Sequence, residues 1–252
     1  MRRGRAWLLA AAVASTACGS GGGLFRQYEY EEDMYLSLDG TATVYVNASV
    51  AALDALRGAT LDDGAAARID RDRVKAMYTT PVTRVVSRPT TSRRSGRQFV
   101  HLRVEVADVR TLGTAPPFAW STYEFDRDGD LHVFRQRVGR SAEGRVGDVA
   151  WTGRELVAFR LHLPSEIVYH NAGPGNPKRG NILAWEQPLV DRLKGAPPVP
   201  GDRCGCLEAR MKTQSILYRT LWLFAASCGA VAAMFAGLIW WIRRVNPDRM
   251  QP

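Results

Sequence analysis

Apolar and polar residues alternate along two runs near the start of the chain, residues 28–38 and 41–47. Alternation with a period of two predicts strands, and Asp39-Gly40 between the runs favours a tight turn, so the region is predicted to be a β-hairpin. The pattern then changes to helical spacing over residues 50–57, which lie between a serine and a glycine suited to cap a helix. A short helix is therefore expected directly after the hairpin.

The rest of the central region continues the same mixture of elements. We predict a helix at 66–77, strands at 82–87 and 99–106, a helical turn at 106–112, a hairpin of 119–125 with 131–138, and strands at 155–163 and 182–186. The polar stretch 88–97 is predicted to be a connection. Many strands with one or two short helices indicate an α+β fold with a mainly antiparallel sheet.

A different pattern follows near the C-terminus, where residues 220–242 contain no charged side chain. At about 1.5 Å per residue this run reaches roughly 35 Å, enough to cross a hydrocarbon core of about 30 Å. Tryptophans lie near both ends, and Arg243-Arg244 follows directly. Residues 216–242 are therefore predicted to form a transmembrane helix, with the tail 243–252 in the cytoplasm by the positive-inside rule.

The N-terminus has the layout of an export signal. Residues 1–17 combine three arginines, a short apolar stretch and small residues, and Cys18 begins a glycine- and serine-rich tether at 18–23. Acylation of Cys18 and ordinary cleavage after Ala17 both fit this order. Residues 24–195 are then expected to form an extracytoplasmic domain, joined to the membrane helix by a proline-rich linker at 196–215.

The distribution of charge along the chain mainly argues against one class of partner. The formal net charge is +9, but residues 24–202 hold 24 basic and 23 acidic side chains, so the excess lies at the two ends. A nucleic-acid partner is therefore not expected. Within the domain, acids concentrate in 24–63 and cations in 68–103. Candidate ligand-binding residues in this basic region are Arg84, Arg88, Arg93, Arg94 and Arg97, which could bind an anionic headgroup or envelope polymer. A solvated loop, or pairing with the acidic segment, is the favoured explanation of the same residues.

Residues that could carry other chemistry are few. The histidines, at 101, 132, 162 and 170, lack the spacing of a metal site, and the acids at 126–130 suit a hairpin turn, so no metal or cofactor is expected. Cys204 and Cys206 could pair between chains, form a strained local disulfide or hold a metal, and pairing between chains is favoured. No catalytic motif is present, so we expect a protein that is not an enzyme.

Small residues recur at every fourth position of the apolar run, at Ala225, Gly229, Ala233 and Gly237. They share one stripe of the helix and would let a second helix approach closely. As the alternative mode of action, we therefore expect that the helix forms a homo-oligomer or binds a membrane-protein partner.

Several segments together resemble the LppM-type domain of bacterial lipoproteins. They are the signal ending in cysteine, the Asp-Gly hairpin followed by VAALDALRG, the segment LPSEIVYHNA with the later GNILAWE, and the single C-terminal membrane helix. The resemblance implies an envelope-facing α+β domain for which lipid or glycolipid binding is expected, and it implies no catalytic residues. The chain lacks the leucine usual three positions before the lipobox cysteine.

The resulting expectation is a membrane-anchored lipoprotein of the bacterial cytoplasmic membrane that binds membrane lipids, a glycolipid or an envelope partner. The alternative is an adaptor or sensor subunit that assembles through its transmembrane helix.

Overall fold

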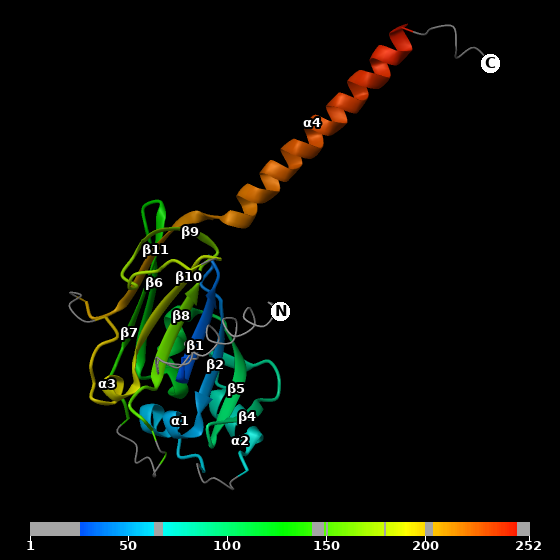
Figure 1. Cartoon of the computed structure of the whole chain (residues 1–252). Coiled ribbons are helices and arrows are strands. Elements are labelled where there is room, and N and C mark those ends of the chain that lie inside the picture. The colour runs from blue at the N-terminus through cyan, green and yellow to red at the C-terminus, as the bar shows by residue number, and fades with distance from the viewer. Residues whose placement is uncertain are drawn as a thin grey trace, which may run out of the picture.

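The computed structural model describes residues 26–62, 68–142, 149, 151–178, 180–199 and 204–245. Over these residues two β-sheets pack against each other, a few short helices lie at one end, and one long helix leaves from the opposite end (Figure 1). The expected α+β class is confirmed. The predicted signal at 1–17, Cys18 and its tether lie outside the described residues.

The larger sheet contains the predicted N-terminal hairpin at its centre. Its strand order is β10-β8-β1-β2-β5-β3, with β4 also paired to β5. The strands are β1 (Tyr28–Leu36), β2 (Ala42–Ser49), β3 (Thr83–Val85), β4 (Thr90–Arg94), β5 (Arg97–Val106), β8 (Leu156–His162) and β10 (Ile182–Pro188). The β1·β8 pair is parallel and the other pairs are antiparallel, so this sheet is mixed.

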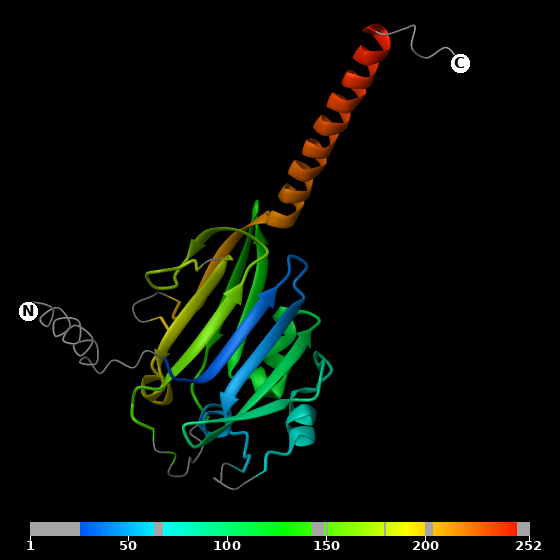
Figure 2. The ribbon, with the colours of Figure 1, turned by 45° about the vertical axis from the view of Figure 1, so that its right-hand side comes forward.

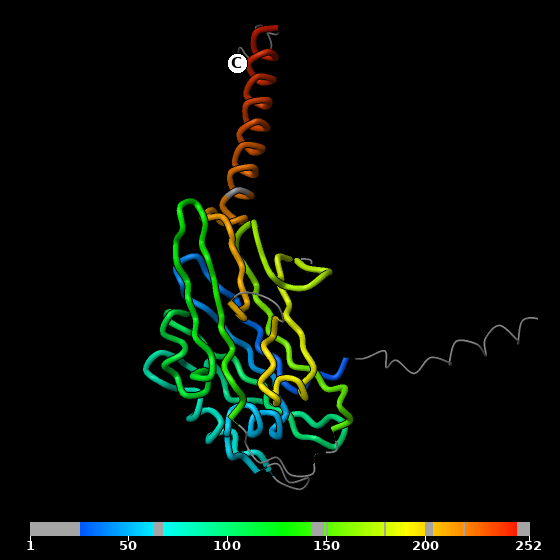
Figure 3. The backbone as a smooth tube through the Cα atoms, turned by 90° about the vertical axis from the view of Figure 1, so that its left-hand side faces the viewer, coloured from blue at the N-terminus to red at the C-terminus, as the bar shows by residue number. Residues whose placement is uncertain are grey.

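The smaller sheet is antiparallel, with the order β6-β7-β11-β9. Its strands are β6 (Ser121–Asp128), β7 (Leu131–Val138), β9 (Ser165–His170) and β11 (Leu207–Ser215). The side view in Figure 3 shows the two sheets as separate layers with the long helix rising above them.

The first hairpin shows how the sequence pattern builds the core. Tyr30, Met34 and Leu36 alternate along β1 with residues that face away from the other sheet, and each is at most 4% exposed. The turn uses Gly40 at φ +89°, a backbone conformation that residues with a Cβ rarely adopt, and Asp39 Oδ1 accepts the Thr41 N–H at 2.9 Å. The inward residues of both sheets form one hydrophobic core.

Short helices close the end of the sandwich that lies away from the long helix (Figure 1). They are α1 (Val50–Arg57), α2 (Arg71–Tyr78) and α3 (Leu189–Leu193), while the 3-10 turns η1 (Val109–Thr114) and η2 (Pro116–Phe118) connect β5 to β6. Ser49 Oγ accepts the Ala52 N–H at 3.1 Å and begins α1, and Gly58 at φ +65° ends it, as predicted.

Two predicted connections are corrected by the structure. Within 88–97, residues 90–94 form β4, because Ser95 and Gly96 both adopt positive φ and turn the chain back into β5. Within the predicted linker 196–215, residues 207–215 form β11, whose Leu207, Ala209 and Met211 are each 1% exposed. Strand β9 and helix α3 were not predicted at all.

The last helix, α4 (Ile216–Val245), starts at the residue after β11. It has 30 residues, or about 45 Å of length, and among the described helices it is the one long and apolar enough to cross a membrane. Its side chains are exposed along its length apart from Arg219, for which burial is not described. The helix extends three residues beyond the predicted end at residue 242.

Candidate functional site

A large hollow lies at the end of the domain from which α4 leaves. We call it the membrane-proximal groove, and its volume is about 990 Å³. It is bordered by the β1–β2 hairpin tip (35–43), the segment 79–84, the end of β5 (105–107) and residues 162–164 and 180. The β1–β2 tip, which borders the groove, points toward α4 in both views (Figures 1 and 2).

The groove combines hydroxyl groups with small apolar surfaces. Its hydroxyl residues are Ser37, Thr41, Thr43, Thr79, Thr80 and Thr83. Apolar contacts come from residues such as Val82 and Leu163, and one ion pair, Arg84–Glu105, lies at its border. Thr41, Thr79 and Thr83 already donate within the protein, to Asp39 Oδ1 and to the Lys75 and Tyr78 carbonyls, so their hydroxyls can only accept hydrogen bonds from a ligand. The lining can still accept hydrogen bonds from a neutral polar group while covering an apolar part of the same ligand.

An aromatic pair forms one wall of the groove. The rings of Tyr35 and His162 stack with their centroids 3.8 Å apart, and Tyr45 meets Tyr35 edge to face at 5.5 Å. Burial lowers the pKa of His162 below its ordinary value; Arg160 acts in the same direction, and Asp33 partly opposes both. The imidazole is therefore neutral at pH 7, and the wall presents uncharged aromatic surface.

One residue links the groove to α4. Pro164 lines the groove, and its carbonyl accepts hydrogen bonds from the Ile216 N–H at 3.1 Å and from Ser215 Oγ at 3.3 Å. The first residue of α4 is thus hydrogen-bonded to the groove's own border. If α4 spans a membrane, the groove lies close to the membrane surface.

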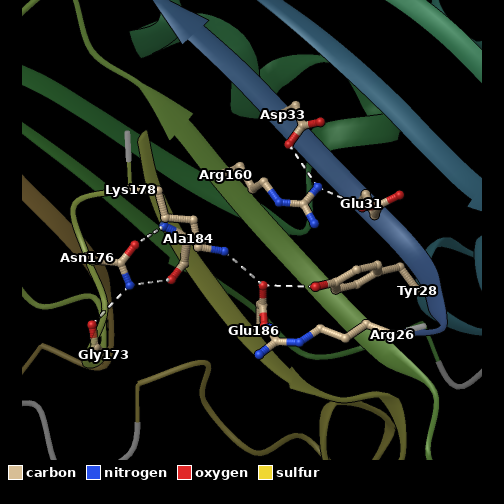
Figure 4. Close-up of polar contacts among 10 residues, drawn as sticks. All are labelled: Arg26, Tyr28, Glu31, Asp33, Arg160, Gly173, Asn176, Lys178, Ala184 and Glu186. Atoms are coloured by element: carbon tan, nitrogen blue, oxygen red, sulfur yellow. Dashed lines mark hydrogen bonds and ion pairs between the residues drawn. The ribbon is translucent and has the colours of Figure 1, made fainter. Parts of the chain in front are cut away.

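The outer face of the larger sheet carries a second polar arrangement, shown in Figure 4. Arg160 Nη1 contacts Glu31 Oε1 at 2.6 Å and Asp33 Oδ1 at 3.3 Å across the parallel β1·β8 pair. Burial disfavours the Arg160 charge, but the two carboxylates outweigh that cost and raise its pKa. These contacts join β8 to β1, so we assign the three groups a structural role.

A neighbouring cluster in Figure 4 is centred on Glu186 of β10. The carboxylate accepts a hydrogen bond from Tyr28 Oη at 2.9 Å, approaches Lys178 Nζ at 3.4 Å and pairs with Arg26. Burial would raise the pKa of Glu186, but these three partners together lower it. This cluster fastens the chain start and the 171–181 loop to the sheet edge.

The five predicted arginines do not converge on one site. Arg97 is buried, bonded to Glu29 at 3.0 Å, and so holds the core rather than a ligand; that prediction is corrected. Arg84 borders the groove, whereas Arg94 lies over the Phe99 ring on the outer sheet face, at the other end of β5. Arg88 contacts Asp72 of α2, and Arg93 pairs with Gln98, seven residues along β5 from Glu105, the partner of Arg84. The sequence alone did not assign these arginines to different places, because it did not predict that residues 90–94 form a strand.

The two cysteines predicted beside the membrane lie before the nine-residue strand β11, which separates them from α4, and they are joined within one chain. Cys204 and Cys206 form a disulfide with their Cα atoms 5.1 Å apart, so the favoured pairing between chains is corrected. Gly205 at φ +57° allows the short loop. Glu208 lies close enough to complete a three-residue metal-ligand set, but its carboxylate contacts Arg135 and Arg210, and both cysteines are in the disulfide. The arrangement favours a structural role.

The predicted helix stripe is on the surface. Ala225, Gly229, Ala233 and Gly237 are all exposed, and a Cβ on either glycine would meet no heavy atom within 4 Å in the described structure. The stripe is therefore free for another helix.

Groove residues such as Tyr35, His162 and Pro164 were missed from the sequence. Their neighbours come from strands that are far apart in the chain, and no short motif marks them.

Comparison with known proteins adds one distant similarity. No protein-family model and no curated protein sequence matches the chain. Among solved structures, the NMR structure of the folded domain of LppM from Mycobacterium tuberculosis is similar, with 13% sequence identity and a TM-score of 0.38. The similarity covers 77% of this chain and 95% of that one. At this level the similarity is too distant to support the functional argument, which rests on the groove and on α4.

Proposed function

We propose that the chain is a single-pass protein of the bacterial cytoplasmic membrane, whose extracytoplasmic domain binds the polar part of a lipid or glycolipid in the membrane-proximal groove. The role is binding rather than catalysis. The observation that carries the proposal is the shared Pro164, which borders the groove and is hydrogen-bonded to the first residue of α4.

The anchor follows from α4. Its sequence is apolar and uncharged from residue 220 to residue 242, and Arg243 and Arg244 occupy its last turn. Cations next to a membrane span favour the cytoplasmic side, so the domain at the other end lies outside. Acylation of Cys18 belongs to the same proposal, because an acyl chain and α4 would hold the domain at one membrane surface.

The groove suits a headgroup better than an acyl chain. It is open, and six hydroxyl side chains line it, whereas a fatty acid chain needs an enclosed apolar cavity. The stacked Tyr35–His162 pair offers apolar ring surface next to these hydroxyls. Sugar and polyol groups present the same combination of C–H and O–H surface.

The test uses native mass spectrometry of the full chain, purified from its membrane in mild detergent with bound lipid retained. Tyr35→Ala combined with Thr43→Val should reduce the lipid-bound fraction at least about tenfold, because it removes one aromatic wall and one hydroxyl. Tyr169→Ala is the matched control, since Tyr169 and Tyr35 are each 46% exposed and Tyr169 lies outside the groove on β9.

Loss of lipid in the groove variant alone supports the proposal. Equal lipid retention in the groove variant, the control and the wild type would refute it. The same spectra test Cys18, because an acylated chain starting at residue 18 has a mass that differs from that of an unmodified chain cleaved after Ala17.

A second candidate function is supported by the exposed stripe on α4. In that case the protein is an adaptor that assembles with another membrane helix, or with a second copy, through Ala225, Gly229, Ala233 and Gly237. Gly229→Leu with Gly237→Leu should abolish a cross-linked complex in membranes. The matched control, Ser227→Leu with Val231→Leu, adds bulk on the opposite face of the helix and should leave the complex intact.

A further inference from the structure

The domain carries exposed cations at the end that lies away from α4. The set consists of Arg71 and Lys75 on α2, Arg88 before β4, and Arg93 on β4, and we call it the distal basic patch. All four side chains are exposed. Figure 1 shows α2 and β4 next to each other at this end, opposite α4.

Contacts between α2 and β4 bring the cations together. Arg71 Nη2 donates to Thr91 Oγ1 at 3.2 Å, and Arg93 lies two residues further along the same face of β4, about 7 Å away. Arg71 and Lys75 are one turn apart on α2. The patch is thus one continuous surface built from two elements.

Most of this charge is not neutralised. Asp72 pairs with Arg88 at 2.9 Å, and the carboxylate of Asp70 accepts the backbone N–H groups that begin α2. Among the described residues, Arg71, Lys75 and Arg93 have no ion pair. Three cations therefore face solvent.

We infer that the distal basic patch binds a phosphate-bearing anionic polymer of the cell envelope. Guanidinium groups bind phosphate with two parallel hydrogen bonds, and three of the four cations are arginines. A polymer fits the continuous strip because successive anionic groups can contact successive cations.

Two other partners fit less well. The membrane that holds α4 fits less well, because Arg93 pairs with Gln98, eight residues or about 26 Å along β5 from its groove end at Val106, several times the screening length of about 8 Å. A protein partner usually requires a buried apolar centre, and none of the large exposed apolar side chains of the described residues lies on α2 or β4. The inference goes beyond the proposed function and rests on it only for placing the patch outside the cytoplasm.

The test measures binding of end-labelled inorganic polyphosphate by fluorescence anisotropy. The full chain is held in nanodiscs of phosphatidylcholine, which has no net charge, so that lipid does not compete. Arg71→Gln with Arg93→Gln should weaken binding about 100-fold, since each charge-assisted contact is worth roughly tenfold in affinity. Arg71→Lys with Arg93→Lys should give an intermediate loss, because it keeps the charge and removes the bidentate geometry.

The matched control is Arg110→Gln with Arg127→Gln, two exposed arginines at the α4 end of the domain. This pair removes the same charge and should change the affinity less than about threefold. An equal loss in the control and patch variants would show general charge attraction and overturn the inference, as would equally tight binding of polyglutamate. Tyr35→Ala with Thr43→Val should leave polyphosphate binding intact, so failure at the patch and failure at the groove give different results.

Discussion

A buried ion pair between α1 and β1 supports the sharpest stability prediction. Arg57 Nη2 lies 3.0 Å from Glu32 Oε2, and their side chains are 5% and 1% exposed. The same carboxylate accepts hydrogen bonds from Tyr30 Oη at 2.8 Å, from Tyr123 Oη at 3.2 Å and from Gln136 Nε2 at 3.2 Å. The perturbation is Arg57→Met, which keeps the volume and removes the cation.

The expected loss of stability follows from the buried Glu32 carboxylate that Arg57→Met leaves without its cation. Without Arg57, Glu32 is a buried carboxylate held by three neutral donors, and breaking one side of a buried pair costs about 3–5 kcal/mol. The variant also loses the guanidinium that lies over Trp120, 3.6 Å from the ring centroid. For a domain of this size, such a loss lowers the melting temperature by about 6–20 °C.

The assay is thermal unfolding of the full chain in detergent, followed by tryptophan fluorescence. Glu32→Gln alone should cost a similar amount, because it leaves a buried cation whose Nε and Nη1 have no hydrogen-bond partner among the described residues. The double variant should lose clearly less than the sum of the two single variants. Strict additivity, or a loss below about 1 kcal/mol for Arg57→Met, would refute the reasoning.

Two further predictions concern pH and packing. Burial is the largest cause that lowers the pKa of His101, His132 and His162 below the ordinary 6.5, so the unfolded chain binds protons more readily and the melting temperature should fall as pH drops through 6.5. His162→Gln should flatten that dependence, and a melting temperature that rises on acidification would contradict it. Gly139→Ala should destabilise the domain, measured as denaturant midpoint, because a Cβ there would lie 2.5 Å from the Trp120 carbonyl oxygen. Gly173→Ala, whose Cβ would meet nothing within 4 Å, should leave the midpoint unchanged.

Local pattern was enough to predict the elements whose signals lie within a few residues. The hairpin around Gly40, helix α1 and the hairpin of β6 and β7 occur where alternation, caps and turn residues placed them. Strand β11 shows the opposite case. Its residues LEARMKTQS alternate as a strand should, but the nearby prolines and the following apolar run favoured a linker. Only pairing with β7 and β9 makes it a central strand.

The candidate site was less predictable than the fold. The groove depends on the parallel pairing of β1 with β8, which brings Tyr35 against His162 although 127 residues separate them. Similarly, Arg88 and Arg97 belong to one basic stretch of sequence, yet the strand turn at Ser95-Gly96 sends Arg97 into the core. Where these side chains lie depends on which distant strands pair with each other, and that pairing cannot be read from a single sequence.

The direct junction between β11 and α4 has a mechanical consequence. Because no residue separates Ser215 from Ile216, a pull on the helix acts along the axis of β11. That strand is hydrogen-bonded on both sides, to β7 and to β9, and these bonds run across the direction of pull. They therefore bear the load together, in shear, instead of being peeled apart one at a time. Helix α4 is thus fixed to a strand of the smaller sheet that is paired on both sides.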